Sequence, residues 1–412
     1  MERCEKITQC IACGCQDLIL VLDLGKQPLA NSFKRSVEEI EEYFPLAINR
    51  CENCSHVQLT HMVNPDLLFK DYLYVSGTSK IQLDYFNWFA EYTIKQTKER
   101  PESVLDIGCN DGSLLDVYKG LGINTYGIDP AENLFKDSSK KHKIACEYFN
   151  ESTFDDGVAF DIITCLNAFA HNYNPLEFLK NAKKIMHRNS LLHITTSQSD
   201  MIINNEFDTI YHEHISFYNT RSMGILCDRA GLQLLRINNH PIHGNSYIFT
   251  IGLKHHFPEN LYGNLVHEKL LGLHSPKTYE KYYKKCVNII EGFRNTVEQI
   301  RRNGYTIIGY GAAAKGNTLL NAAGIGPDFI IDDNPLKQGL FSPGLSIPVY
   351  GIEYLDKYSE VDRVCFIPLA WNFFEGIRAN IETKRKGKND LFVRYFPEIV
   401  VENPDEVDYH PV

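Results

Sequence analysis

The stretch 103-SVLDIGCNDGSLLDVYKGLG-122 is the feature that most constrains the fold. It has the pattern of a buried strand, a glycine-bearing turn and a helix that starts near Asp111 and Ser113. Similar strand and helix patterns follow at 124–129, 160–167, 175–187 and 190–196. Repeated strand-turn-helix units predict an α/β fold with a parallel doubly wound sheet, whose ligand lies at the carboxyl ends of the strands.

A second α/β unit is predicted toward the C-terminus. Residues 276–302 have the pattern of a long polar helix, which we interpret as a connector. Another strand-turn-helix pattern follows in 305-YTIIGYGAAAKGNTLLNAAG-324, and strand-like segments continue at 328–339, 363–371 and 391–400. The chain is therefore expected to hold two nucleotide-type folds.

The cysteines are unevenly distributed. Six of the twelve lie in the first 54 residues, including the pairs 10-CIAC-13 and 51-CENC-54. Two C-x-x-C pairs suit tetrahedral zinc, because each offers two thiolates from one tight turn. We predict the ligands Cys10, Cys13, Cys51 and Cys54, although Cys15 could replace Cys13. Four thiolates leave no open position for a substrate, so this zinc should be structural.

Length and charge limit the classes of function. A chain of 412 residues suggests two or three domains, and a net charge of −10 argues against a nucleic-acid partner. No run of about 18 apolar residues occurs, and the first ten residues lack the apolar core of a secretion signal. We therefore expect a cytoplasmic protein with no membrane partner.

The two glycine turns differ in the ligand that they favour. In 106-DIGCNDG-112 the glycines allow close approach of a ligand, and Asp129 ends the next strand, where a carboxylate can accept ribose hydroxyls. Because the turn is not G-x-G-x-x-G and begins with an acid, it favours S-adenosylmethionine over NAD; a generic strand-helix turn is the alternative.

The second turn, 309-GYGAAAKGN-317, presents small residues and Lys315 at a helix start. Exposed amide groups and a point charge there suit an anion, so we predict a diphosphate cradle that includes Gly311, Ala312 and Lys315. The alternative is a tight strand-helix crossing in which alanines merely permit close packing.

The segment 209-TIYHEHISFYN-219 collects proton-handling side chains. A metal site, a catalytic site and a set of paired structural residues are all compatible with it. Zinc is the weaker interpretation, because no third ligand beside its H-x-H is evident. His212 should point away from its neighbours on an extended segment, and we interpret it as structural.

Taken in order, several segments resemble the sugar C-methyltransferases. These are 10-CIAC-13, 27-QPLANSF-33, 51-CENCSHVQL-59, 72-YLYVSGTS-79, 104-VLDIGCNDGSLL-115, 128-IDPAEN-133, 209-TIYHEHISFY-218, 241-PIHGNS-246 and 309-GYGAAAKGN-317. The resemblance implies a zinc-binding module (1–72), a class I methyltransferase core (73–285) and a Rossmann-like C-terminal domain that contributes to nucleotide-sugar binding (286–412). It also implies S-adenosylmethionine as donor and a dTDP-linked 4-keto-6-deoxysugar as the usual acceptor.

The resemblance also assigns site residues. Those that match the reaction site are Tyr74, Asn167, His171, Tyr211, Glu213 and His214. We place the donor at Asp106, Gly108, Asn110, Asp129, Pro130 and Asn167, and the acceptor at Asn167, His243, Gly311, Ala312 and Lys315. The four zinc ligands match those preferred above.

This family's chemistry explains the proton-handling segment. Methylation of a carbon beside a ketone needs a base for the ring hydrogen and a donor for the enolate oxygen. We hypothesise that His214 is the base, that Tyr211 donates to the oxyanion with His171 or Tyr74 sharing that role, and that Glu213 orients a neighbour or binds a sugar hydroxyl. An O- or N-methyltransferase is the main alternative; a zinc-bearing nucleic-acid methyltransferase and a scaffold without turnover are weaker ones.

Three departures from the family pattern leave the acceptor sugar open. They are 196-TSQSDMI-202 in place of an acidic, aromatic stretch, Asn245 in place of a glycine and Cys109 in place of a serine. None of them affects the predicted fold or donor.

Overall fold

The computed structural model describes residues 2–70, 72, 74–78, 80–241, 246–259, 261–385, 390–403 and 406–409. They form two compact units. Unit 1 comprises Met1–Leu20, Ile48–Asp200 and Glu213–Ser275, and unit 2 comprises Val21–Ala47, Met201–His212 and Pro276–Val412. Each unit therefore draws on separate stretches of the chain, and the division into three domains at 72 and 285 stays a prediction.

Unit 1 is built on a seven-stranded sheet in the order β12-β13-β10-β9-β6-β7-β8. Its strands are β6 (Ser103–Ile107), β7 (Asn124–Ile128), β8 (Lys143–Ala145), β9 (Phe160–Leu166), β10 (Met186–Thr196), β12 (Leu232–His240) and β13 (Ser246–Leu253). Strands β6 to β10 run parallel, so their carboxyl ends meet at one edge of the sheet. This is the edge at which the sequence predicted a ligand.

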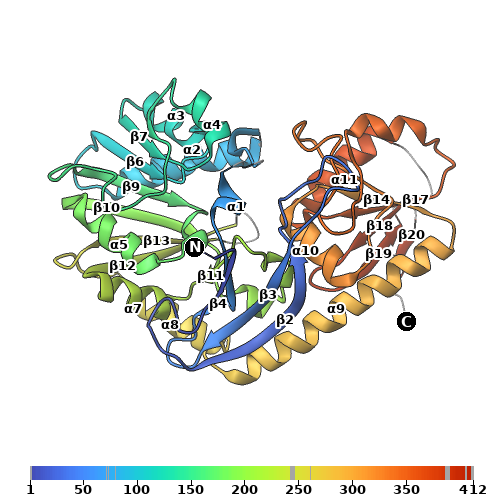
Figure 1. Ribbon diagram of the computed structural model, residues 1–412, viewed down its shortest axis with the longest axis horizontal. Coiled ribbons are helices and arrows are strands. Elements are labelled where there is room, and N and C mark those ends of the chain that lie inside the picture. The colour runs from blue at the N-terminus through green and yellow to red at the C-terminus, as the bar shows by residue number, and fades with distance from the viewer. Residues whose placement is uncertain are drawn as a thin grey trace. The chain divides into compact units, whose positions relative to one another are not determined.

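Helices cover both faces of this sheet, as Figure 1 shows. They include α2 (Lys80–Gln96), α3 (Ser113–Gly120), α4 (Glu132–Ser138), α5 (Pro175–Lys184), α7 (Thr220–Ala230) and α8 (Leu261–Leu270). Neighbouring strand residues point to opposite faces: Val104 packs with the apolar residues of α2 and α3, and Leu105 with those of α5 and α7. Strands buried on both faces explain the continuous apolar runs in the sequence.

The predicted elements of unit 1 are confirmed with two differences. The helix predicted over 175–187 ends at Lys184, and β10 begins at Met186. The sheet is also not wholly parallel, because β13 pairs antiparallel with both β10 and β12. The short connection between β12 and β13 explains the antiparallel pairing of these two strands, since parallel strands need a longer crossover.

The N-terminal segment contributes strands to two small sheets, the second of which also contains a strand from residues 216–217. One pairs β1 (Cys4–Lys6) with β5 (His61–Val63), and the other has the order β11-β4-β3-β2. The strands of the latter are β2 (Leu18–Pro28), β3 (Tyr43–Cys51), β4 (Val57–Leu59) and β11 (Ser216–Phe217). Two short helical elements follow in unit 1, α1 (Asp66–Phe69) and η1 (Ser76–Thr78). Strand β11 belongs to the proton-handling segment 209–219, and its pairing with β4 joins that segment to the cysteine-bearing N-terminal segment.

Unit 2 contains a second seven-stranded sheet, in the order β16-β15-β14-β17-β18-β19-β20. Its strands are β14 (Thr306–Tyr310), β15 (Phe329–Ile331), β16 (Val349–Tyr350), β17 (Val364–Pro368), β18 (Leu391–Arg394), β19 (Val400–Asn403) and β20 (Glu406–Tyr409). Strands β14 to β18 are parallel, and β19 and β20 are antiparallel. The predicted second α/β unit is confirmed.

The helices of unit 2 are α6 (Met201–Asn204), α9 (Pro276–Arg302), α10 (Ala314–Ala323) and α11 (Phe374–Lys384), with 3₁₀ turns η3 (Phe207–Thr209), η5 (Ile352–Lys357) and η6 (Trp371–Phe373). Helix α9 has the bounds predicted from the sequence. It buries one stripe that includes Tyr282, Phe293 and Val297, and its other residues are partly or fully exposed. Among the described helices, none is both long and apolar enough to cross a membrane.

Candidate active site

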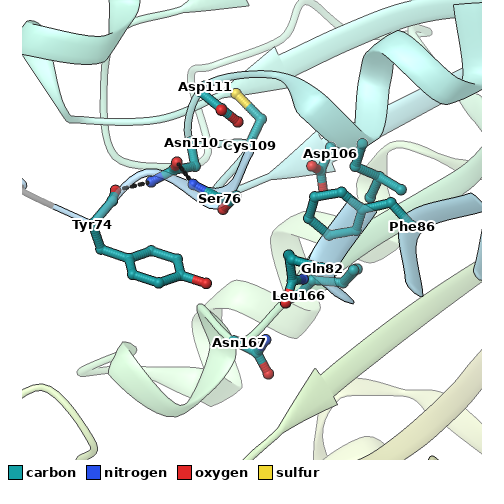
Figure 2. A pocket seen from close by; sticks show the side chains of 12 residues that line it. Tyr74, Ser76, Gln82, Phe86, Asp106, Cys109, Asn110, Asp111, Leu166 and Asn167 are labelled. Atoms are coloured by element: carbon teal, nitrogen blue, oxygen red, sulfur yellow. Dashed lines mark hydrogen bonds between the residues drawn. The ribbon is translucent and has the colours of Figure 1, made fainter. Parts of the chain in front are cut away.

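A pocket lies at the carboxyl edge of the unit 1 sheet. Its walls come from β6 and the glycine turn after it, from the end of β9, from α2, and from the segment of residues 72 and 74–78, hereafter the strap (Figure 2). It is lined by Tyr74, Ser76, Gln82, Phe86, Asp106, Gly108, Cys109, Asn110, Asp111, Leu114, Leu166 and Asn167. The structure therefore brings together five of the predicted site residues, namely Tyr74, Asp106, Gly108, Asn110 and Asn167.

The glycine turn needs its glycine. Gly108 has a φ of +80°, and a Cβ there would lie 2.5 Å from the Cβ of Ala168. Its amide donates to the carbonyl of Ile128 at 2.8 Å, which fixes the turn against β7. Asn110 and Asn167 also have positive φ angles, of 51° and 55°. Strained residues gathered around one pocket are typical of a ligand site.

Asp106 is a buried acid at the bottom of this pocket. It is 3% exposed, and its Oδ1 accepts a hydrogen bond of 2.7 Å from the Thr164 hydroxyl. Burial raises the pKa of Asp106 to about 7, since the Thr164 bond offsets only part of the desolvation and the Asp129 charge adds to it. A buried carboxylate of this kind is stabilised by a cation, which fits the amino-acid portion of the predicted donor.

The pKa of Asp106 predicts a pH dependence of donor binding. Binding of a cationic group needs the ionised acid, so the affinity for S-adenosylhomocysteine should fall as the pH drops below about 7, by about tenfold per pH unit. Calorimetry between pH 5.5 and 8 measures this. Asp106→Asn should bind weakly and without that slope, whereas Asp116→Asn, a change at a partly exposed acid of α3, should keep it. If the affinity of Asp106→Asn for S-adenosylhomocysteine still falls with decreasing pH in the same way, Asp106 is not the acid that binds the cation of the donor.

Asp129 stands behind the turn rather than in the wall of the pocket. Its Oδ2 accepts from the amide of Asn110 at 2.8 Å and its Oδ1 from that of Ala131 at 2.9 Å. Burial raises the pKa of Asp129 in spite of these two bonds. Each carboxylate oxygen keeps a second lone pair, so acceptance of ribose hydroxyls stays compatible with this geometry. Asp129 and Pro130 do not line the pocket, and their roles stay predictions.

The strap was not predicted as a wall of the donor site; of its residues, only Tyr74 was expected in the site, and there as a residue of the reaction site. Asn110 holds it from both sides: its Nδ2 donates to the carbonyl of Tyr74 at 3.0 Å, and its Oδ1 accepts from the amide of Ser76 at 2.9 Å (Figure 2). Asp111 accepts from the amide of Gly77 at 2.9 Å. The serine and glycine of 72-YLYVSGTS-79 were the sequence signal for this contact, because small residues allow a backbone to approach a turn closely.

Gly77 gives a test of that contact. A Cβ at this position would lie 2.4 Å from Ser113 Oγ and 2.5 Å from Asp111 Oδ2. Gly77→Ala should therefore push the strap off the turn and weaken S-adenosylhomocysteine binding about tenfold, an ordinary cost of overpacking. Gly120→Ala is the matched control, since a Cβ there meets nothing within 4 Å. Equal affinities of the two variants in calorimetry would argue against the strap as part of the donor site.

His214 lies near the ends of β9 and β10. Its Nδ1 is 3.2 Å from the Oγ of Ser197, which follows β10, and its ring stacks on that of His171 with centroids 5.4 Å apart. The next residue, Ile215, donates its amide to the carbonyl of Ala170 at 2.9 Å. Two histidines predicted from distant parts of the sequence are thus neighbours at the edge of the sheet that carries the donor pocket.

His171 is held as a neutral ring. It stacks on Phe69 at 5.3 Å as well as on His214, and burial lowers the pKa of His171 to about 4. Among the described residues its Nε2 is buried without a hydrogen-bond partner. A neutral imidazole can donate a hydrogen bond but carries no charge near pH 7.

Glu213 and Tyr72 form a pair that the sequence did not reveal. Glu213 is 3% exposed, and its Oε2 accepts a hydrogen bond of 2.9 Å from the hydroxyl of Tyr72 in the strap. The two residues before Glu213, Tyr211 and His212, belong to unit 2. Tyr211 is partly buried there, and His212 is buried with its Nε2 3.3 Å from the carbonyl of Phe44, which fits the structural role expected for it.

The glycine turn of unit 2 differs from the prediction at both Gly311 and Ala312. The amide of Gly311 donates to the carbonyl of Ile331 at 2.7 Å. The amide of Ala312 donates to Asp332 Oδ2 at 2.6 Å, and its carbonyl accepts from the ammonium of Lys337 at 2.7 Å. Both amides are therefore engaged within the protein rather than directed at a ligand. Lys315 lies in the first turn of α10, with its ammonium 5.1 Å from the centre of the Trp371 ring. His243 lies outside the described residues.

Asp208 is a second residue that the sequence analysis missed. It is fully buried in unit 2, and its Oδ2 accepts from the Trp371 indole at 2.8 Å. Burial raises the pKa of Asp208 to about 6, while the charge of Lys315 opposes that rise. The side chain of Trp371 thus contacts both the Asp208 carboxylate and the ammonium of Lys315 at the start of α10.

The four predicted zinc ligands lie together. All four Sγ atoms of Cys10, Cys13, Cys51 and Cys54 are within 4.8 Å of one another, and the Cys10–Cys54 and Cys13–Cys51 distances are 3.6 and 3.5 Å. Tetrahedral zinc with bonds of about 2.3 Å requires sulfur atoms about 3.8 Å apart, so the set fits the ion. The thiol of Cys15 is directed at Asp17 instead and is not in the cluster, so the geometry favours Cys13 over Cys15 as the fourth ligand.

A parallel sheet with this glycine turn, a buried acid on its first strand and an antiparallel hairpin at one edge defines a class I methyltransferase. Three family models match the chain in order: "Putative zinc binding domain" at residues 10–69, "Methyltransferase domain" at 83–237 and "C-methyltransferase C-terminal domain" at 241–397. Over most of its length the chain is thus similar to S-adenosylmethionine-dependent C-methyltransferases, and its N-terminal module carries a four-cysteine set that fits zinc.

Two named relatives are also similar in sequence. The chain is 26% identical over 387 residues to "C-methyltransferase NovU" of Streptomyces niveus, covering 89% of this chain and 90% of the relative. It is 30% identical over 106 residues to "Ubiquinone biosynthesis O-methyltransferase" of Glaesserella parasuis serovar 5 (strain SH0165), covering 23% and 45%. A solved S-adenosylmethionine-dependent methyltransferase from Clostridium acetobutylicum ATCC 824 aligns with a TM-score of 0.35 and 13% identity, over 43% of this chain and 93% of that one.

Proposed function

We propose that this enzyme transfers a methyl group to the ring carbon beside the ketone of a nucleoside-diphosphate-linked 4-keto-deoxysugar, through an enolate. The observation that carries the proposal is the His171–His214 stack, held by Ser197 at the sheet edge that also forms the donor pocket. S-adenosylmethionine supplies a methyl group on a sulfonium. Carbon methylation further requires removal of a proton from the acceptor, and this arrangement offers a base for it.

His214 takes the ring proton. Its Nδ1 faces the Ser197 hydroxyl, which fixes the orientation of the ring and makes Nε2 the nitrogen that accepts the proton. The electron pair of the broken C–H bond moves into the enolate and then forms the new carbon–carbon bond, while the methyl–sulfur bond breaks. His171 adds a flat, neutral neighbour, so no second positive charge opposes protonation of His214.

The enolate oxygen needs a hydrogen-bond donor. Tyr211 is the proposed donor, three residues before His214. His171 can share the role, because its pKa of about 4 keeps it neutral and its Nε2 has no partner among the described residues. Tyr74, whose ring extends from the strap into the pocket, is the third candidate (Figure 2). Glu213 orients Tyr72 and, in our proposal, a hydroxyl of the sugar.

The nucleotide diphosphate is proposed to bind unit 2 at the start of α10. Because the amides of Gly311 and Ala312 already donate to Ile331 and Asp332, the proposed donors are the first amides of α10 together with the ammonium of Lys315, and Gly311 contributes only the close approach that its missing side chain permits. Lys315→Ala should raise the KM for the nucleotide sugar about tenfold or more and leave S-adenosylhomocysteine affinity unchanged, as expected for loss of one charged contact. An unchanged KM in steady-state assays would remove Lys315 from the proposal.

The proposed reaction is tested with methyl-labelled S-adenosylmethionine and a panel of nucleotide-linked 4-keto sugars. We expect one sugar to gain a methyl group on the carbon beside the ketone, detected by NMR, and solvent deuterium to enter that position when the donor is replaced by S-adenosylhomocysteine. A methyl group found on oxygen or nitrogen would instead establish the alternative, an O- or N-methyltransferase.

A further inference from the structure

The backbone of the strap is hydrogen-bonded to two loops beside the donor pocket. One is the glycine turn after β6, and the other leads into α4. Asn133, at the start of α4, donates to the carbonyl of Tyr72 at 2.9 Å and accepts from its amide at 3.2 Å. Asn110, in the glycine turn, does the same for Tyr74 and Ser76. A shift in either loop therefore moves the strap.

The side chain of Tyr72 extends this connection to the catalytic segment. Its hydroxyl donates to Glu213 Oε2 at 2.9 Å, directly before His214 in the chain. The ring is fixed by Phe69 and Tyr74, at centroid distances of 5.9 and 6.4 Å. Since Glu213 is 3% exposed, a donor to its carboxylate stabilises a charge that water reaches poorly.

We propose that Tyr72 is a positioning residue that links the donor pocket to the catalytic segment through its hydrogen bond to Glu213. Donor binding, which fixes the strap, fixes Glu213 through this bond; by reciprocity, the bond strengthens donor binding. The part that concerns the acceptor rests on the function proposed above, whereas the part that concerns the donor does not.

The donor side is tested first, by calorimetry with S-adenosylhomocysteine. Tyr72→Phe keeps the ring and deletes the hydrogen bond, and Glu213→Ala deletes the same bond from the other end. Each should weaken binding about tenfold, and the double variant should be no weaker than either single one. A purely structural role would give additive losses, and additive losses would overturn the proposal.

Tyr148→Phe is the matched control. It also removes a hydrogen bond from a tyrosine to a carboxylate, Asp66 at 3.3 Å, but at an exposed position. If Glu213→Ala does not fold, the comparison of Tyr72→Phe with Tyr148→Phe decides: equal affinities for S-adenosylhomocysteine would overturn the link.

The acceptor side is tested with dTDP-4-keto-6-deoxyglucose as the probe. Tyr72→Phe should lower kcat about tenfold and Tyr148→Phe should not. An unchanged kcat in Tyr72→Phe would overturn the acceptor half of the link. If the native enzyme converts no 4-keto sugar, the proposed function fails, and the calorimetry still decides whether Tyr72 couples the strap to Glu213.

Discussion

His214→Ala should lower methyl transfer by a factor of about 10² to 10⁴ and abolish solvent-deuterium exchange at the acceptor carbon. That range is the ordinary contribution of a positioned general base. The affinity for S-adenosylhomocysteine should stay within about twofold of the native value, because the pocket walls come from other residues, such as Asp106 and Phe86. The measurements are turnover with labelled donor, exchange followed by NMR, and calorimetry.

The control for this variant is His187→Ala. His187 is also a histidine with a polar partner, Asp161 at 2.9 Å, but it is 40% exposed at the start of β10, the end of the strand opposite to the pocket. It should retain full activity. Native rates of exchange and transfer in His214→Ala would show that another group removes the proton, whereas retained exchange with lost transfer would show that His214 acts after proton removal.

The donor site was largely predictable because its signals are local. A glycine with positive φ and an acid at a strand end are properties of a short segment, and in the sequence 106-DIGCNDG-112 they stand side by side. Asp106, Gly108 and Asn110 accordingly line the pocket. The positive φ of Asn167, by contrast, follows from its place after β9 and had no local signal.

The contacts that complete the site are not local. Tyr72 meets Asn133, 61 residues later, and Glu213, 141 residues later, so only the folded chain brings them together. The same holds for Trp371 and Asp208. In unit 2 the sequence showed small residues suited to a phosphate, but it did not show that Asp332 takes the Ala312 amide. Residue type predicted the kind of site, and tertiary contacts decided which groups remain for a ligand.

The cysteines of the zinc module lie in a small buried cluster of their own. It contains Ala12 and the ligands Cys10, Cys51 and Cys54, with a few partly buried neighbours. The apparent free energy of structural zinc binding is about 10 kcal/mol or more, which the apolar contacts of so small a cluster cannot replace. Each C-x-x-C turn is closed by a residue with positive φ, Gly14 or Ser55, so the turns are shaped for this task.

Removal of this zinc should abolish turnover although no substrate touches it. Strand β4 begins at Val57, three residues after Cys54, and pairs with β11. The amide of Leu59 donates to the carbonyl of Ile215 at 2.9 Å, next to His214. Asn219 also donates to the carbonyl of Ser55 at 2.8 Å. Loss of the module therefore releases the segment that carries the base.

We expect Cys51→Ser to bind less than one zinc per chain, to lower the melting temperature by roughly 10 °C or more, and to lose methyl transfer. Metal analysis, thermal unfolding and the labelled-donor assay measure these effects. Cys15→Ser should match the native protein in all three, since Cys15 is outside the cluster. If Cys51→Ser still binds S-adenosylhomocysteine, the loss of methyl transfer arises in the catalytic segment, because the donor pocket is built on the seven-stranded sheet of unit 1. Native turnover without zinc would instead show that β11 and His214 keep their places unaided, and the metal would then matter only for the stability of the N-terminal module.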